Sequence, residues 1–383
     1  MKISQTMAGF CLAALLGACG GGGGNDGATG GGGASITPTA PLASTPIATT
    51  TSYANFKQIG LAPQALPPGD NTVRAYGDFT GNGRPDLFRA VITYNPGLPV
   101  SQATPSRFEF YARQSDGRYA ATTALPPQAG CLHPRKAIVA DFNNDGRPDV
   151  FVACRGYNAA PFPGETNKVV LSQPDGRYQV SDASLDVGFN HGATAADLNG
   201  DGKVDVVVVN NFDPDRAYVL LNDGTGHFTR ESPSRLPASM RSGNYYSVEL
   251  VDINEDGKLD LLLGGHEFEG APTAIFLNPG ANNFSGVVAS VVPAVPNQGV
   301  VLDFTITGSG ASRALWVLRT SGGDGSFYQS KVVQKVQFPS LASSVVLSQQ
   351  PAEWIIPWLI PAVVNGVNVI TSDNLDDAVL LPQ

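Results

Sequence analysis

The stretch that decides the fold runs from Asp197 to Val209 and reads DLNGDGKVDVVVV. Side chains that carry oxygen stand at positions one, three, five and nine of its first nine residues, and glycine stands at position six. A carboxylate or carboxamide at every other position, around a glycine that permits a tight turn, gathers oxygen atoms about one centre. Such a centre suits a hard cation, and we expect Ca²⁺.

The nine-residue pattern occurs four times, beginning at Asp78, Asp141, Asp197 and Asp252. In each copy we expect side chains one, three, five and nine to bind the ion, with the backbone carbonyl of position seven completing the shell. The first copy has two carboxylates instead of three, so we expect it to bind most weakly. An aspartate-glycine hairpin without an ion is the alternative, which four copies in register disfavour. The expected ligands of up to four Ca²⁺ ions are Asp78, Thr80, Asn82, Asp86, Asp141, Asn143, Asp145, Asp149, Asp197, Asn199, Asp201, Asp205, Asp252, Asn254, Asp256 and Asp260.

The residues after each loop distinguish between calcium folds. EF-hand and dockerin loops continue into a helix that supplies an acidic ligand at position twelve. Here position twelve holds Arg89, Val152, Val208 or Leu263, none of which can ligate. The apolar runs on both sides of the loops, rich in β-branched residues, are typical of buried strands. Each loop therefore joins two strands in a hairpin.

Further apolar runs and glycine turns follow each hairpin, so each repeat is predicted to be a four-stranded meander. The loops begin at intervals of 63, 56 and 55 residues (141 − 78, 197 − 141 and 252 − 197). A four-stranded unit of this length cannot cover its own faces and must pack radially against copies of itself. The sequence therefore predicts an all-β fold, a β-propeller.

Two degenerate units follow the fourth loop. One contains Val301–Phe304 and a strand near Ala314–Leu318, and the other begins near Trp358 and has room for three strands. We expect neither to bind calcium like the others. The segment Tyr53–Ile59 is predicted to be the N-terminal strand that closes the last blade, which removes two open sheet edges. We expect six blades, with seven as the alternative.

The four loops and their flanking strands resemble the FG-GAP/VCBS repeats of integrin α-subunit propellers and many bacterial surface proteins. The resemblance is strong from about Ala75 to Asn278 and weak beyond. It implies a calcium-binding propeller. Because the family is functionally broad, it implies neither a ligand nor a reaction.

The N-terminal segment indicates export. Residues 1–18 have the layout of a secretory signal, with a short apolar stretch after Lys2, and Leu16-Gly17-Ala18-Cys19 resembles a bacterial lipobox. Residues 19–52 are rich in Gly, Thr and Pro and are expected to form a tether, and 53–383 the propeller. We expect a lipoprotein of the bacterial cell envelope, anchored through Cys19, with an ordinary signal peptide as the alternative.

Charge and cysteine content fit an exported protein. The formal net charge is −9, and no basic run suits nucleic acid. Because four Ca²⁺ ions would offset most of that charge, we interpret the acidity as metal ligation. Cys131 and Cys154 flank the second loop, and we favour a disulfide over two buried thiols because antiparallel strands can bring them together.

Three functions are compatible with the sequence. We rank first a binding or adhesion module for a glycan or protein, because no catalytic motif or appended catalytic domain is present. A lyase or hydrolase acting on polysaccharides or sugars would need a cluster built from residues such as Arg135, Tyr245, Tyr246 and His266. The third function is a structural role in an envelope complex.

Histidines near the starts and ends of the predicted strands could line one rim of the ring. They are His133, His191 and His266, and no pair has metal-ligand spacing. We expect packed or hydrogen-bonded side chains and assign no catalytic residue. The apolar stretch Trp354–Pro361 is interpreted as the inner strand of the sixth blade, with a partner-binding patch as the alternative.

Overall fold

The structure is a computed structural model that describes residues 63–67, 72–93, 95, 97–127, 130–211, 216–323, 325–350, 358–374 and 379–383. The chain divides into two compact units, residues 1–39 and 40–383, and all described residues belong to the second. The predicted signal segment, the lipobox cysteine, the tether and the closing strand Tyr53–Ile59 lie outside the described residues.

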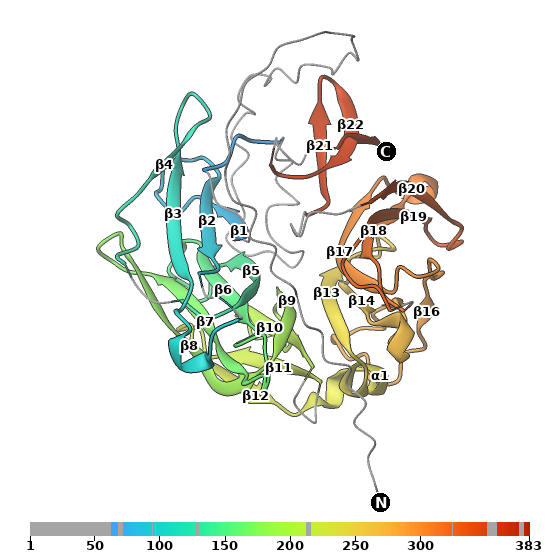
Figure 1. The fold of residues 1–383 in the computed structure, drawn as a ribbon, viewed down its shortest axis with the longest axis horizontal. Coiled ribbons are helices and arrows are strands. Elements are labelled where there is room, and N and C mark those ends of the chain that lie inside the picture. Colours follow the sequence, from blue (N-terminus) through green and yellow to red (C-terminus); the bar gives the residue numbers. More distant parts are fainter. Residues whose placement is uncertain are drawn as a thin grey trace, which may run out of the picture. The chain divides into compact units, whose positions relative to one another are not determined.

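The second unit is a six-bladed β-propeller, as the sequence predicted (Figure 1). Each blade is an antiparallel meander, with four strands in blades one to five and three described strands in blade six. The first two blades contain β1 (Thr72–Gly77), β2 (Asp86–Val91), β3 (Arg107–Arg113), β4 (Tyr119–Ala121), β5 (Pro134–Ala140), β6 (Asp149–Cys154), β7 (Glu165–Ser172) and β8 (Tyr178–Gly188). The third and fourth contain β9 (Asn190–Ala196), β10 (Asp205–Asn210), β11 (Ala217–Asn222), β12 (Phe228–Glu231), β13 (Tyr245–Val251), β14 (Asp260–Gly265), β15 (Ala274–Phe276) and β16 (Ser290–Val291). The last two contain β17 (Val300–Thr307), β18 (Ala314–Thr320), β19 (Lys331–Gln337), β20 (Ser343–Gln349), β21 (Ile360–Val364), β22 (Val367–Thr371) and β23 (Leu381–Pro382).

Among the residues that the structure describes, helical structure is confined to single turns and one short helix between strands. These are η2 (Val100–Gln102), η3 (Pro233–Arg235), α1 (Ala238–Ser242), η4 (Glu267–Glu269) and η5 (Gly310–Ser312). Met240 of α1 packs in the core between blades three and four.

The first strand of each blade lies nearest the axis, and these inner strands pack in chain order: β1 on β5, β5 on β9, β9 on β13, β13 on β17 and β17 on β21. The four aspartate loops follow the ends of β1, β5, β9 and β13, so they share one rim, which we call the loop rim. The inner strands begin at the opposite rim, which we call the start rim. The ends of the second strands lie there too, because β5 and β6 pair Pro134 with Cys154 and β13 and β14 pair Tyr245 with Gly265.

The hydrophobic core lies between the blades. One cluster joins Phe79 of blade one to Val139 and Tyr178 of blade two, and another joins Phe142 of blade two to Tyr218 and Phe228 of blade three. The corresponding clusters between later blades continue the circle, and Tyr76 and Leu87 of blade one pack with Ile360 of blade six. Each blade therefore buries its faces against its two neighbours, as its length predicted.

The ring closes through a buried ion pair between blade one and blade six. Arg74 of β1 donates from Nε to Asp373 Oδ2 (2.7 Å) and from Nη2 to Asp373 Oδ1 (2.8 Å). Tyr76 Oη donates to the same carboxylate at 2.9 Å. The backbone of Gln64 donates to the Asp373 carbonyl and forms a parallel bridge with Asn374, so a segment before β1 does contact blade six.

Candidate functional site

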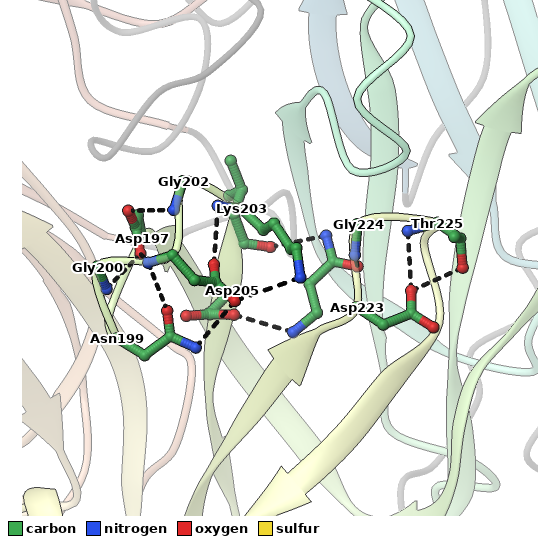
Figure 2. Close-up of polar contacts among 12 residues, drawn as sticks. Asp197, Asn199, Gly200, Gly202, Lys203, Asp205, Asp223, Gly224 and Thr225 are labelled. Atoms are coloured by element: carbon green, nitrogen blue, oxygen red, sulfur yellow. Dashed lines mark hydrogen bonds and ion pairs between the residues drawn. The ribbon is translucent and has the colours of Figure 1, made fainter.

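The aspartate loops have one shared geometry on the loop rim, shown for the third loop in Figure 2. The carboxylate of Asp197 accepts backbone N–H groups of Gly200 and Asp201 at Oδ1 and of Gly202 at Oδ2. The loops beginning at Asp78, Asp141 and Asp252 repeat the bonds from positions five and six. Glycine at position six has a positive φ angle in every loop, for example +82° at Gly202. A residue with a side chain adopts this backbone conformation less readily than glycine.

The ninth aspartate of each loop is buried in the blade. Asp149 accepts the backbone N–H groups of Phe142 and Asn143 at Oδ2 and of Ser172 at Oδ1. Burial raises the pKa of Asp149 to about 7 and that of Asp205 to about 6, and the backbone hydrogen bonds offset only part of this rise. Burial also raises the pKa of Asp86 and of Asp260. A nearby cation would favour the ionised form of each group.

The fifth aspartates lie at the exposed side of the loops. The backbone N–H of Lys203 donates to Asp201 Oδ1 and lowers the pKa of Asp201. The side chain of Lys258 and, after it, the backbone N–H of Lys258 donate to Asp256 and lower the pKa of Asp256. The Lys258 Nζ atom also lies 3.1 Å from Asp256 Oδ2. These carboxylates are therefore ionised at neutral pH.

The donor chemistry of the loops fits a hard cation, because every expected ligand offers oxygen and one carboxylate in each is desolvated. Within the part of the chain that the structure describes, however, no three acidic, histidine or cysteine side chains converge closely enough to form a metal-binding group. The first and ninth carboxylates are instead oriented by backbone N–H groups. A carboxylate oxygen that accepts one such bond retains a second lone pair for an ion.

A small cavity lies at the start rim, where inner strands of different blades converge on the axis. It has a volume of about 20 Å³, room for about one water molecule. Its lining residues are Arg135, Lys136, His191, Gly192, Tyr246, Ser247, Leu302 and Trp358. Blades two, three, four, five and six thus all contribute to it.

Three rings stack beside this cavity. The Tyr246 ring lies between His191, at 4.0 Å between centroids, and His266, at 4.1 Å. His191 is 4% exposed, and its Nδ1 lies 3.0 Å from the Phe189 carbonyl, which fixes Nδ1 as the protonated nitrogen of the neutral ring. His266 Nδ1 lies 3.0 Å from Glu269 Oε2. The Nε2 atoms of both histidines are buried and have no hydrogen-bond partner among the described residues.

Two arginines make this rim electropositive. Arg155 follows β6, and its guanidinium lies 4.5 Å from the centroid of the Phe189 ring. Burial lowers the pKa of His191 well below its usual value, and the charges of Arg155 and Arg135 lower it further. The same three causes, with Arg135 ahead of Arg155, lower the pKa of His133. Both histidines are therefore neutral at physiological pH.

A buried ion pair crosses the axis next to the cavity. Lys136 Nζ of blade two lies 2.5 Å from Glu249 Oε1 of blade four, with side chains 8% and 1% exposed. The same Nζ lies 5.4 Å from the ring centroid of Trp358, just before β21. Glu249 and Lys136 therefore neutralise each other.

A disulfide supports the start rim. The Sγ atoms of Cys131 and Cys154 are 2.28 Å apart and their Cα atoms 6.0 Å apart, so the segment before β5 is joined to the end of β6. Both residues are fully buried. His133 lies two residues after Cys131 and Arg155 directly follows Cys154, so the disulfide holds these side chains at one rim.

The structure places the histidines singled out in the sequence at one rim, and it brings Arg135, Tyr246 and His266 to the same neighbourhood. Tyr245 does not join them, because it packs in the core between blades three and four with Met240 and Leu263. Neighbouring residues of a strand point to opposite faces, so only Tyr246 faces the axis. Sequence reasoning missed Arg155, which no motif marks, although its place directly after Cys154 was a usable signal. Among the described residues, no helix has the length and apolar character needed to cross a membrane.

Comparison with known proteins identifies the repeat. Residues 78–152, 141–208 and 197–263 each match the model of the FG-GAP-like repeat, and each match runs from one aspartate loop through the next. The chain therefore carries FG-GAP-like repeats in a six-bladed propeller. No curated protein is similar enough to count as a match.

Several solved structures of low sequence identity align with most of this chain. The periplasmic gluconolactonase of Pseudomonas aeruginosa has a TM-score of 0.46 at 16% identity, over 79% of this chain and 78% of that one. Saccharomyces cerevisiae Sqt1 has a TM-score of 0.43 at 9% identity, over 80% and 71%. A putative exo-β-1,3-galactanase from Bifidobacterium bifidum has a TM-score of 0.42 at 8% identity, over 79% and 99%.

Proposed function

We propose that this protein is a calcium-stabilised binding module of the bacterial cell envelope, which holds a glycan or a protein at its start rim. The observation that carries the proposal is the buried polar cluster of Arg135, His191 and Tyr246 around the axial cavity. Burying polar groups costs free energy unless they are paired, and His191 Nε2 is left without a partner among the described residues. Such a cost is expected at a binding site and not in a purely structural core.

The test is a glycan-array screen in the presence of calcium, with a variant on the rim. Phe268 of η4 stacks on His266 and is 37% exposed, so Phe268→Ala removes contact area without opening the core. Leu185→Ala is the matched control, because Leu185 is 90% exposed on the outer strand β8. We expect specific hits that Phe268→Ala weakens and Leu185→Ala leaves intact. Hits that Phe268→Ala does not weaken would mean that the ligand binds away from the start rim.

Calcium enters this proposal as a stabiliser of the loop rim. Support comes from four loops of oxygen donors and from the ninth aspartates, which are buried in the blades. A ligand that binds only the folded state raises the melting temperature, and the stabilisation grows with the logarithm of the ligand concentration. We expect a higher melting temperature in millimolar calcium than in chelator, and an unchanged midpoint would refute the role.

The envelope location rests on the sequence around Cys19, which lies outside the described residues. If Cys19 is lipidated, the full-length protein will incorporate labelled palmitate and fractionate with membranes. Cys19→Ser will abolish both. A Cys19→Ser protein that stays in the membrane fraction would contradict lipid anchoring.

One observation favours catalysis as a second candidate. The Glu269 carboxylate orients His266 through Nδ1, which leaves Nε2 beside the Tyr246 ring as a possible base. Burial raises the pKa of Tyr246 well above its usual value, so its hydroxyl stays protonated and can donate a hydrogen bond to a substrate. Cleavage of an array hit, seen as new reducing ends or unsaturated products and abolished in His266→Gln, would establish an enzyme. Intact ligand after prolonged incubation would exclude it for that ligand.

A further inference from the structure

Building on the proposed binding function, we propose that the start rim takes a saccharide that carries a carboxylate. Arg155 pairs with the carboxylate, His191 Nε2 accepts a hydroxyl, and the aromatic row beside them supports the sugar ring. The ligand class follows from the charge, the hydrogen-bonding capacity and the shape of this rim.

Arg155 supplies an uncompensated positive charge in a chain of net charge −9. Two neighbouring cations are neutralised: Lys136 by Glu249 at 2.5 Å, and Arg319 by Glu267 at 2.8 Å. Arg155 makes no ion pair with any described residue, and its buried Nε has no hydrogen-bond partner among them. Its guanidinium carbon lies 4.5 Å from the centroid of the Phe189 ring, and the planar donors of a guanidinium suit a carboxylate. An anionic ligand would compensate this charge.

His191 adds a requirement for a hydroxyl. Because Nδ1 donates to the Phe189 carbonyl and the ring is neutral, Nε2 presents a lone pair and can only accept a hydrogen bond. A carboxylate cannot donate to it, whereas a sugar hydroxyl can. One ligand that satisfies both Arg155 and His191 must therefore combine an acid with a hydroxyl.

The cavity limits how the ligand enters. His191 lines a space of about 20 Å³, which admits a group the size of a hydroxyl and no more. The rest of the ligand must lie outside, across the rim. A hydroxyl projecting from a ring meets this condition, whereas a bulky side chain of a peptide does not.

A row of rings offers a surface for that remainder. It runs from Tyr246 to His266 at 4.1 Å, to Phe268 at 4.8 Å and to Phe327 at 5.4 Å between centroids. Phe268 is 37% exposed, so the row reaches solvent. The apolar C–H face of a pyranose can pack on such rings while its hydroxyls remain hydrated.

The test uses digalacturonate and its neutral counterpart galactobiose, titrated by calorimetry into the calcium-saturated protein. We expect digalacturonate to bind at least tenfold more tightly. Arg155→Gln should remove that difference while leaving galactobiose binding unchanged. Arg230→Gln is the matched control, because the Arg230 guanidinium also lies 4.5 Å from a ring centroid, that of Tyr218, but on the outer strand β12. The affinity of this variant for digalacturonate should stay within twofold of that of the unmodified protein.

His191→Asn tests the hydroxyl contact. The asparagine amide can still donate to the Phe189 carbonyl but offers nothing in place of Nε2, so both sugars should bind about tenfold more weakly. Circular dichroism and melting curves check that each variant is folded. Absent digalacturonate binding, equal affinity for the two sugars, or binding indifferent to Arg155→Gln would overturn the proposal. If the acidic preference is absent but Phe268→Ala still abolishes an array hit, the start rim is a binding site without selectivity for a carboxylate. If Phe268→Ala leaves every hit unchanged, the proposed binding site at the start rim is wrong as well.

Discussion

Replacing Asp373 with alanine should open the ring where blade six meets blade one. The Asp373 carboxylate accepts two hydrogen bonds from the Arg74 guanidinium, at 2.7 and 2.8 Å, and one from Tyr76 Oη at 2.9 Å. Arg74 is 6% exposed and Asp373 fully buried. Alanine would leave the Arg74 charge buried without its counterion, together with an unmatched hydroxyl.

Removing one partner of a buried ion pair costs about 3–5 kcal/mol, because the remaining charge stays desolvated. We expect this loss in the free energy of unfolding of Asp373→Ala. With a urea dependence of about 3 kcal/mol/M, the midpoint should fall by about 1 M or more. The double variant Arg74→Met/Asp373→Leu, which removes both charges, should recover most of the loss.

The assay is urea denaturation followed by tryptophan fluorescence in saturating calcium. Asp116→Ala is the control, because Asp116 pairs with Arg118 at the same 2.7 Å but in solvent, with side chains 47% and 83% exposed. That exposed pair should contribute little to stability, because solvent screens the two charges. A loss for Asp373→Ala no larger than that of the control would refute the idea that this ion pair closes the ring.

Three other changes test separate parts of the structure. Asp201→Asn should reduce the calcium stoichiometry by one site in calorimetry and leave the other loops binding, whereas loss of all sites would contradict independent blades. Replacing both Cys131 and Cys154 with serine should cost about 3 kcal/mol, from the entropy of a loop with a sequence separation of 23, seen as a lower urea midpoint that reductant no longer changes. His191 is buried and neutral in the folded state, whereas in the unfolded chain it binds a proton below about pH 6.5. As the pH falls below that value, the free energy of unfolding should therefore decrease by about 1.4 kcal/mol per pH unit because of this group. His191→Asn should flatten the acid limb of the stability profile by that slope, and an unchanged slope would show that His191 is charged in the fold.

The ring could be predicted from sequence because its information is local and repeated. Each loop specifies a turn, two flanking strands and a place in the period, so the inner strands β5, β9 and β13 were located before the structure was known. Degenerate blade five kept its apolar runs, which sufficed to predict β17 and β18. The pairing of Arg74 with Asp373 could not be predicted, because nothing local links residues 299 positions apart.

The start rim could be anticipated as a collection of residues but not as an assembly. His133, His191 and His266 stand in different blades, and only ring closure brings their neighbourhoods together. Strand β13 is buried along its whole length, so its sequence does not alternate between apolar and polar residues. The sequence therefore could not predict which of Tyr245 and Tyr246 faces the axis. Whether a single atom such as His191 Nε2 has a hydrogen-bond partner depends on side-chain packing, which sequence patterns do not predict.

The ion pair across the axis bears on how the molecule unfolds. In linear repeat proteins each unit touches only its neighbours, so unfolding can proceed one unit at a time. Here Lys136 of blade two meets Glu249 of blade four, and Trp358 of blade six lies against the same ammonium group. Alternate blades are thus energetically coupled through the centre as well as round the circumference. Unfolding of one blade would leave a buried charge in another blade without its counterion. This favours a single cooperative unfolding transition for the whole ring.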